Sequence, residues 1–178
     1  MERQEALVLI SQYDLEKLSI EKRRDLLEDW WGINAEEAEF HNLPEDLQSE
    51  IVEFEVPVFH FQDTKYNPLL LEAIKYGFIG VKNEYLAAYV SDILKKSVEV
   101  TGEEEKLLVC FCCSYLTIQE RGMYDICPVC DWEDDGGDSL AHYSCPNHMT
   151  LLDGKQNFEN TFKLEGISFG GIEKYYSE

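Results

Sequence analysis

Two closely spaced cysteine pairs constrain the fold of this chain more than any other feature. Each pair has the form C-x2-C, and the pairs are Cys110 with Cys113 and Cys127 with Cys130. Such a pair can present two thiolates to one metal ion from a single tight turn. Two such turns make a closed tetrahedral set of four thiolates, which structural zinc prefers. The pattern therefore predicts a structural Zn²⁺ site with no open position for a substrate.

The distance between the pairs indicates how the two turns meet. Residues 114–126 separate them, and two short strands with a tight turn can span that gap. We expect residues 115–119 and 123–126 to form this hairpin, so that the second turn returns beside the first as in a zinc ribbon. Zinc binding would contribute roughly 10–16 kcal/mol of apparent folding free energy. A loop-rich region of this size is marginal without such a metal.

A third cysteine in the first cluster offers an alternative ligand. Cys110 with Cys113 makes the ordinary C-x2-C turn, whereas Cys110 with Cys112 makes only C-x-C, which is less common. We therefore expect Cys113 to be the ligand. Cys112 is then a spare thiol, either buried or capable of redox chemistry.

Two further groups resemble metal sites but fit less well. Cys145 and His148 have half-site spacing, with His142 nearby, but a half-site needs partners, so we expect an ordinary loop before the following helix. The acidic run 131–136 resembles the start of a calcium loop. Its twelfth position is His142, where an EF-hand needs a bidentate glutamate. We expect a solvated acidic loop with Trp132 packed inward.

The sequence contains no motif typical of catalysis. It lacks a Gly-rich phosphate loop, a G-x-S-x-G elbow and an H-E-x-x-H helix. A redox C-x-x-C normally follows a strand and opens a helix within a βαβ pattern, and neither pair has that context. The prediction is a protein without catalytic residues, and thiol-redox activity remains the alternative.

The charge is strongly acidic along the whole chain. There are 36 acidic and 15 basic residues, for a net charge of −21, and the excess is −10 in residues 1–97 and −11 in residues 98–178. Such a field repels nucleic acid and anionic membranes and speeds encounter with basic proteins. We find no targeting or membrane-spanning segment. Cysteine pairs without an export signal indicate a reducing, cytoplasmic location.

The local patterns predict an α+β protein with two regions. Residues 1–97 are expected to be helical, with starts at Ser19, Pro44, Asn67 and Asn83, and residues 54–61 could be extended. Residues 98–178 are expected to hold the zinc-binding β-hairpin unit and one C-terminal helix, opened by a capping pair of Thr150 and Asp153. No regular structure is predicted after Gly166. Of the neighbouring Trp30 and Trp31, one is expected in the core and the other could be exposed.

Three stretches resemble the bacterial CPCC-type cysteine-rich family over about residues 107–163. They are Cys110-Phe111-Cys112-Cys113, the run Ile126-Cys127-Pro128-Val129-Cys130 with Trp132-Glu133-Asp134-Asp135-Gly136, and Pro146-Asn147-His148-Met149-Thr150-Leu151. The resemblance implies a bacterial cytoplasmic protein with a zinc-ribbon-like element, and it implies no activity. The chain departs from the family pattern by replacing a proline with Phe111, a glycine with Ser114 and a non-cysteine residue with Cys145.

Three function classes follow from these features. The acidic charge and the closed metal site favour a protein-binding role, most concretely an immunity protein that neutralises a basic nuclease toxin, by analogy with small acidic bacterial proteins of that kind. A zinc-ribbon module in transcription or RNA handling is the second class, but it needs a basic face, and only five basic residues follow residue 97. A thiol-redox protein is the third. The sequence identifies neither the interface residues nor the oligomeric state.

Overall fold

The computed structural model describes residues 1–165, with side chains up to Thr161. The side chain of Phe162, which the sequence places in the last helix, and the segment after Gly166 lie outside the described residues. The described elements, in chain order, are α1 (Arg3–Lys17), α2 (Ile20–Trp30), α3 (Ala38–His41), α4 (Glu45–Glu53), the 3-10 helix η1 (Thr64–Tyr66), α5 (Asn67–Tyr76), α6 (Asn83–Leu94), β1 (Leu108–Val109), β2 (Leu116–Ile118), β3 (Tyr143–Ser144), β4 (Met149–Thr150) and α7 (Leu151–Glu165).

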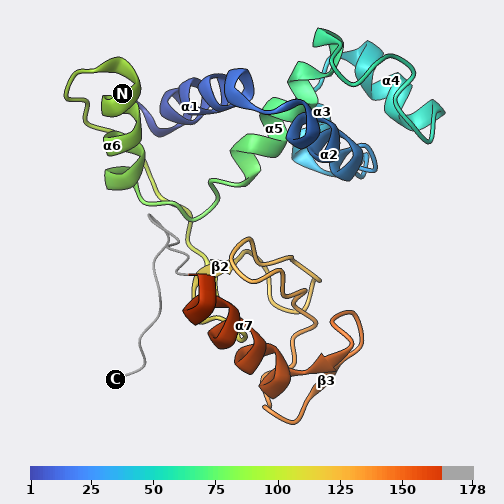
Figure 1. Ribbon diagram of the computed structural model, residues 1–178, viewed down its shortest axis with the longest axis vertical. Helices are drawn as coiled ribbons and strands as arrows, with labels where there is room; N and C mark the ends of the chain where they lie inside the picture. The colour runs from blue at the N-terminus through green and yellow to red at the C-terminus, as the bar shows by residue number, and fades with distance from the viewer. Residues whose placement is uncertain (166–178) are drawn as a thin grey trace. The chain divides into compact units, whose positions relative to one another are not determined.

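The chain forms two compact units. Unit 1 comprises residues 1–78 and 88–98, and unit 2 comprises residues 79–87 and the chain from Glu99 onward. Figure 1 shows helices in blue to green along the first part of the chain, and short strands with α7 in yellow to red along the second. The predicted α+β class, with a helical N-terminal region, small β-hairpins and a C-terminal helix, is confirmed. The domain boundary expected between residues 97 and 98 stays a prediction.

Helices α2, α4 and α5 of unit 1 begin where the sequence predicts. The hydroxyl of Ser19 accepts a hydrogen bond from the N–H of Lys22 at 3.2 Å and so caps α2. Pro44 immediately precedes α4, and α5 has a proline in its first turn and ends before Gly77. These caps, prolines and glycines act on residues only a few positions away, and for this reason the sequence alone predicts them.

The core of unit 1 forms around α5, which packs against α1 and α2. The rings of Trp31 and Tyr66 meet edge to face, with centroids 5.5 Å apart. Trp31 is buried, and Trp30 is half-buried against the same core and against Tyr76. The expectation that one of the two tryptophans is a core residue is therefore confirmed. The buried members of this core are Leu27, Trp31, Phe40, Leu43, Leu47, Tyr66, Leu69 and Leu70.

Residues 54–61 form bends and turns. The sequence pattern allowed an extended strand here, but the structure has none at these residues. Their backbone groups bond to side chains rather than to a neighbouring strand. The N–H of Val58 donates to the carboxylate of Glu50, and the N–H of Phe59 donates to the hydroxyl of Tyr66. Alternation of apolar residues alone does not make a strand when no partner strand is available.

The hairpin predicted from residues 115–119 and 123–126 is wrong. In the structure β2 pairs antiparallel with β1, which precedes the first cysteine pair. Ile126 instead forms an antiparallel bridge with Glu133, across the second cysteine pair. Each C-x2-C therefore lies at the tip of its own short hairpin. The carboxylate of Asp125 accepts the N–H groups of residues 119 and 120 at 2.8 Å and shapes the connection between the two hairpins.

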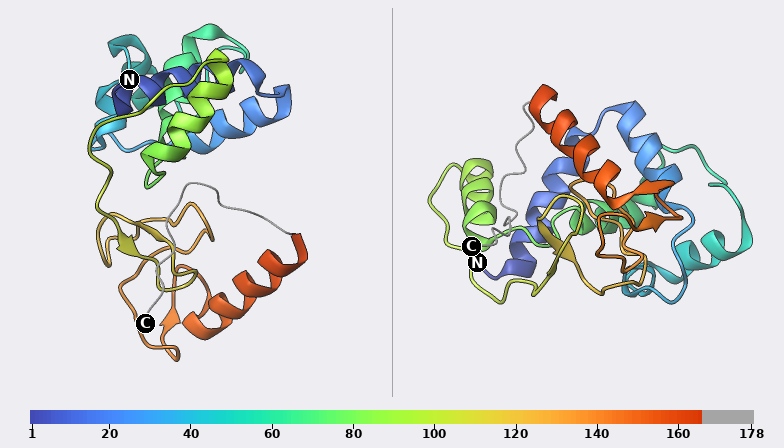
Figure 2. Two further views of the ribbon diagram at one scale, coloured as in Figure 1. Left: turned by 90° about the vertical axis from the view of Figure 1, so that its left-hand side faces the viewer. Right: turned by 90° about the horizontal axis from the view of Figure 1, so that it is seen from below.

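A third hairpin and a long helix complete the described part of unit 2. β3 and β4 pair antiparallel, and α7 follows β4 directly, as both views of Figure 2 show. The predicted capping pair is confirmed, because the N–H of Asp153 donates to the hydroxyl of Thr150 at 3.2 Å and the N–H of Thr150 donates to the carboxylate of Asp153 at 3.2 Å. No helix in the described part of the chain has both the length and the hydrophobicity that crossing a membrane requires.

Candidate metal centre

The first cysteine pair lies in a tight turn between β1 and β2. The N–H of Ser114 donates to the carbonyl of Cys110 at 2.9 Å, and the N–H of Cys110 donates to the carbonyl of Tyr115 at 2.8 Å. These two bonds close the turn and bring Cys113 beside Cys110. Ser114 has a φ of 67°, a left-handed conformation that glycine adopts more readily. The serine therefore stands at the position where a glycine would relieve strain.

The second cysteine pair repeats the same geometry. The N–H of Asp131 donates to the carbonyl of Cys127 at 2.9 Å, and the N–H of Cys127 donates to the carbonyl of Trp132 at 2.9 Å. Asp131 has a φ of 55° and so occupies the position equivalent to Ser114. Aspartate tolerates this conformation better than most residues. The two turns are thus built alike, and each points two thiols in one direction.

The structure brings the four predicted cysteines together. The Sγ atoms of Cys110, Cys113, Cys127 and Cys130 all lie within 4.8 Å of one another. The sulfurs of Cys110 and Cys130 are 3.7 Å apart, and those of Cys113 and Cys127 are 3.6 Å apart. A tetrahedron with metal–sulfur bonds of 2.3 Å has edges of about 3.8 Å. The two close pairs, each joining one turn to the other, fit a single metal ion held by four thiolates.

The cluster is shielded from solvent, and its thiols are not joined as disulfides. Cys110, Cys113 and Cys127 are buried, and Cys130 is half-buried. All six cysteines, each within the described part of the chain, are free thiols. Sulfurs 3.6 Å apart are far beyond the length of an S–S bond, which is about 2.05 Å. The geometry is therefore that of a ligand set, with protein sulfur on every side.

Crowding of the thiols shifts the pKa values of Cys113, Cys127 and Cys130 in different directions. Hydrogen bonds from Cys110, Cys113 and Cys130 lower the pKa of Cys127, although burial opposes this. The hydrogen bond with Cys110, followed by that with Cys127, raises the pKa of Cys113, and hydrogen bonds with the other cysteines of the two turns raise the pKa of Cys130. Thiols with a raised pKa hold their protons more tightly than an isolated cysteine does. A divalent ion would replace those protons and allow four thiolates to approach closely.

The hydroxyl of Thr117 supports one ligand from outside the cluster. Its Oγ1 lies 3.0 Å from the sulfur of Cys127, and Thr117 is almost fully buried. A hydroxyl that hydrogen-bonds to a metal-bound sulfur fixes the orientation of that ligand. β2 positions this group, because Thr117 is the central residue of that strand.

A buried ion pair braces the first hairpin against the acidic run. Arg121 pairs with Asp134, whose side chain is only 2% exposed, and it also donates to the carbonyl of Val109. The guanidinium stacks on Phe111, 3.8 Å from the ring centroid. Phe111 stands where the family has a proline, and the stacking gives this departure a structural role. The expected solvated loop is therefore wrong at Asp134.

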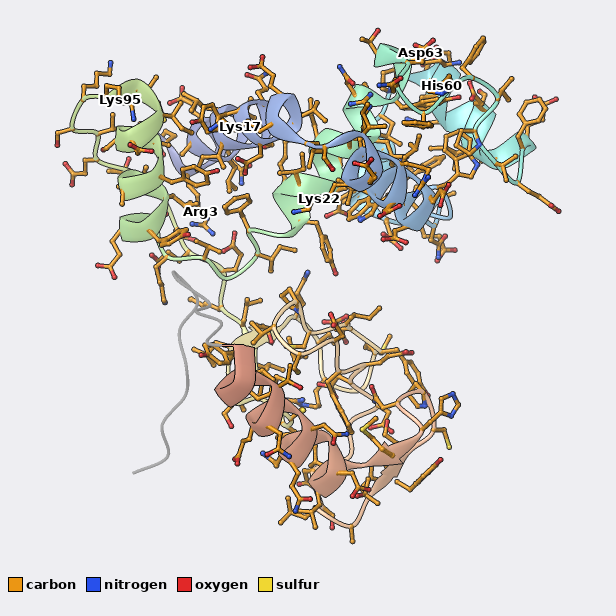
Figure 3. The ribbon with its side chains drawn as sticks, in the orientation of Figure 1. Arg3, Lys17, Lys22, His60, Asp63 and Lys95 are labelled. Carbon is orange, nitrogen blue, oxygen red and sulfur yellow. The ribbon has the colours of Figure 1, made fainter. Side chains whose placement is uncertain are left out.

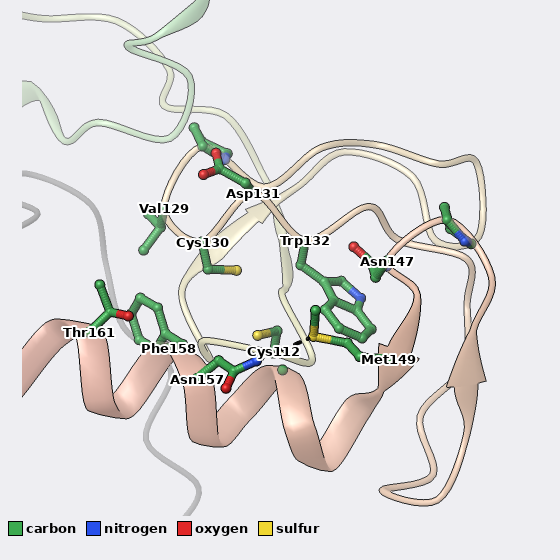
Figure 4. A pocket seen from close by; sticks show the side chains of 13 residues that line it. Cys112, Val129, Cys130, Asp131, Trp132, Asn147, Met149, Asn157, Phe158 and Thr161 are labelled. Carbon is green, nitrogen blue, oxygen red and sulfur yellow. Dashed lines mark hydrogen bonds between the residues drawn. The ribbon is translucent and has the colours of Figure 1, made fainter.

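Helix α7 covers the second turn through Trp132, which is buried as predicted. A Cβ atom at Gly154 would lie 2.5 Å from Cζ3 of Trp132 and 3.5 Å from the sulfur of Cys112. The glycine in the first turn of α7 therefore allows the helix to approach the indole closely. A cavity of about 710 Å³ opens between the second turn and α7, and Cys112, Trp132 and Phe158 line it (Figure 4).

Cys112 lies at this cavity, with its sulfur close to Gly154. Its carbonyl accepts a hydrogen bond from the ammonium of Lys155 at 3.5 Å. The hydrogen bond with Cys130 lowers the pKa of the Cys112 thiol, and the charge of Lys155 acts in the same direction. The Cys112 sulfur thus contacts Cys130 from the side of α7 but is not one of the four clustered sulfurs. Cys113, as expected, is the fourth member of the cluster.

The two further groups that resemble metal sites in the sequence lie outside the cluster of four cysteines. Cys145 and His148 belong to the turn between β3 and β4, and both are exposed. His142 pairs with Asp135, with Nε2 2.9 Å from the carboxylate. Burial alone would raise the pKa of Asp135, but hydrogen bonds, chiefly from His142, lower it. Asp135 is thus mostly shielded by its partners, so the expected solvated loop is wrong here too.

Sequence reasoning missed the supporting residues Thr117, Arg121 and Asp134 and the packing role of Gly154. One of them had a usable signal: Arg121 is the only basic residue between Lys106 and Lys155. An isolated base in an acidic stretch indicates a specific ion pair. Thr117 and Gly154 had no comparable signal, because their partners are distant in the chain.

Comparison with known proteins agrees with the geometry of this region. Residues 108–164 match the family model described as Cysteine-rich CPCC, and this match covers about a third of the chain. The predicted resemblance is confirmed for these residues. No curated protein and no solved structure matches the chain. The cysteine cluster, β1, β2 and most of α7 all fall within the matched residues.

Proposed function

We propose that this protein is a cytoplasmic, zinc-stabilised immunity protein that neutralises a basic nuclease toxin by direct binding. The observation that carries the proposal is the net charge of −21, spread over both parts of the chain. A strongly acidic surface can occupy the site where a nuclease binds the phosphate backbone of its substrate. Long-range attraction would also speed the encounter between the two proteins.

The ion pairs of the structure support this proposal. Part of the positive charge is already used within the described part of the chain, where at least six basic side chains contact carboxylates. These side chains are Arg24, Lys65, Lys75, Lys82, Lys95 and Arg121. A partner therefore meets a surface on which acidic groups predominate, and the same surface disfavours a role in nucleic-acid binding.

On this proposal the metal is Zn²⁺ and its role is structural. Four protein sulfurs fill a tetrahedral coordination sphere and leave no position for a substrate, so we assign no catalytic residue. Zinc binds such a set without redox chemistry of its own. Elemental analysis of the purified protein should find one zinc per chain. Purified, folded protein that contains no bound transition metal would contradict this assignment.

Co-expression tests the neutralising role. The partners would be the product of the adjacent open reading frame and, separately, a panel of basic bacterial nuclease domains. We expect protection of the host cells, a complex on size-exclusion chromatography, and an association rate that falls steeply with added salt. Absence of both protection and complex formation would exclude the proposal. Binding of nucleic acid by the protein alone at low salt would instead favour the transcription or RNA-handling alternative.

A further inference from the structure

Residues 52–59 carry an unusual run of exposed apolar side chains. This segment, here called the 52–59 segment, includes the last residues of α4 and the turn that follows. Scattered apolar residues are normal on a protein surface, but a contiguous group of large ones marks an interaction site. Its exposed apolar residues are Val52 (71%), Phe54 (43%), Val56 (68%), Val58 (52%) and Phe59 (53%).

The backbone of the 52–59 segment is held in place although its side chains face solvent. At its start, the indole N–H of Trp31 donates to the carbonyl of Phe54 at 2.9 Å. Trp31 is only 5% exposed and belongs to the core of unit 1. The indole therefore ties the segment to the buried core of unit 1.

Two buried side chains hold the other end of the segment. The carboxylate of Glu50 accepts the N–H of Val58 at 3.2 Å, and the hydroxyl of Tyr66 accepts the N–H of Phe59 at 2.8 Å. The Tyr66 hydroxyl in turn donates to Glu50 at 2.7 Å. Because the backbone is already ordered, docking of a partner loses less conformational entropy than docking onto a flexible loop.

Negative charge surrounds these apolar side chains. Glu53 and Glu55 alternate with them and are exposed, and the side chain of Asp46 on α4 is 70% exposed. The nearby ammonium of Lys65 is occupied, since it contacts both Glu50 and Asp46. Figure 3 labels His60, which directly follows the segment, at the end of unit 1 that carries α4.

We infer that the 52–59 segment is the surface through which the protein binds its basic partner. The inference rests on the proposed function and names the interface for it. The matching partner surface is a shallow apolar pocket bordered by lysine and arginine side chains. A second copy of this chain fits less well, because it would bring Glu53 and Glu55 against identical carboxylates.

Two double variants separate the apolar and the charged contributions. Val56→Ser with Val58→Ser removes apolar surface without changing charge, and Ile20→Ser at a 55% exposed site on α2 is its control. Glu53→Gln with Glu55→Gln removes charge alone. Its control is Glu36→Gln with Glu37→Gln, at two other exposed glutamates. All seven substituted positions in these four variants are exposed, so the fold should be unchanged, and thermal unfolding verifies this.

The probe is the nuclease domain or neighbouring gene product that the wild-type protein binds in the co-expression experiment. We expect the valine variant to raise Kd by roughly 30-fold. The glutamate variant should slow association several-fold and weaken its salt dependence, with little change in dissociation. Both controls should bind as the wild type does.

Each other outcome overturns the inference in a distinguishable way. If the wild type binds the probe and both double variants bind equally well, the interface lies elsewhere, while the proposed function stands. If the wild type binds none of the probes, the proposed function fails and this inference fails with it. If sedimentation shows a homodimer that the valine variant dissociates, the segment contacts a second copy of the chain and not a basic partner.

Discussion

The two units of this protein are stabilised by different means. Unit 1 buries a continuous apolar core under regular helices. The described part of unit 2 has strands of two or three residues, and four of the nine buried members of its core are cysteines, beside Tyr115, Ile118, Val129, Trp132 and Leu151. In unit 1, cooperative packing specifies the structure. In the described part of unit 2, the hairpins are too short to do so alone, and we propose that a metal ion held by the four converging thiols supplies the missing stability.

Metal removal should show the largest difference between the units. We expect Cys127→Ser, or a strong chelator, to abolish metal binding and unfold the region around the cysteine cluster, with an apparent loss of roughly 10–16 kcal/mol. Hydrogen exchange should show lost protection in residues 107–161 and unchanged protection in residues 1–78. Cys145→Ser, at an exposed thiol outside the cluster, is the matched control. Simultaneous loss of protection in both ranges would show that the units do not fold separately.

Truncating a core side chain of unit 1 tests whether damage to that unit leaves the metal site of unit 2 unchanged. Leu70 is fully buried, so Leu70→Ala should destabilise unit 1 by about 2–5 kcal/mol. Zinc affinity, measured by chelator competition, should stay unchanged, because the cluster does not depend on this core. Val8→Ala, at a 41% exposed site on α1, should have little effect on either measurement. A parallel fall in zinc affinity with Leu70→Ala would remove the distinction between the units.

Loss of the hydroxyl that supports Cys127 should weaken the metal site without removing a ligand. Thr117→Val has a similar shape but cannot hydrogen-bond to the sulfur. We expect zinc affinity to fall about 10–100-fold, as is typical for residues that orient a metal ligand. Thr117→Ser, which keeps the hydroxyl, should recover most of the affinity. Equal affinity in the valine and serine variants would mean that the hydroxyl does not act on the metal.

Gly154→Ala sets helix propensity against packing. Alanine favours a helix over glycine by about 1 kcal/mol. The added Cβ would press on the indole of Trp132, and overpacking typically costs about 1–3 kcal/mol. We therefore expect a small net loss of stability in the zinc-bound protein. Gln156→Ala, at an exposed site on α7, should be neutral or slightly stabilising, and a stabilising Gly154→Ala would show that α7 does not pack closely on Trp132.

The acid sensitivity of unit 1 should depend on one buried carboxylate. Burial tends to raise the pKa of Glu50, but hydrogen bonds from Lys65, Tyr66 and Val58 outweigh it and lower the pKa. Because the pKa of Glu50 is lower in the folded state than in the unfolded state, its ionised carboxylate stabilises unit 1 at pH values above the ordinary pKa of a glutamate. This stability is lost as the pH falls from that ordinary pKa toward the lowered pKa of the folded state.

Glu50→Gln should therefore flatten the dependence of unit 1 stability on pH below about pH 5. The measurement is denaturant unfolding of unit 1 as a function of pH. Glu53→Gln, at an exposed site on the same helix, should keep the wild-type dependence. An unchanged profile in Glu50→Gln would contradict the assigned role of this carboxylate.

Helix starts and the ligand-like cysteines were predictable because their determinants are local. Ser19 caps the helix that follows it, and the spacing of Cys127 and Cys130 is that of one turn. The strand pairing was not predictable in the same way. Residues 115–119 have two sequence neighbours with similar patterns, and nothing local distinguishes β1 from residues 123–126 as the partner of β2.

The sequence by itself determined the α+β class, most helix boundaries, the four thiols that meet and the acidic character of the surface, because each depends on residues close together or on composition. Only the tertiary structure decided that each cysteine pair lies at the tip of its own hairpin and that the buried carboxylate of Asp134 pairs with Arg121. It also decided that hydrogen bonds hold the backbone of residues 52–59 in place while their apolar side chains face solvent. These features depend on contacts between distant residues, whose free energies are set only when the chain is folded.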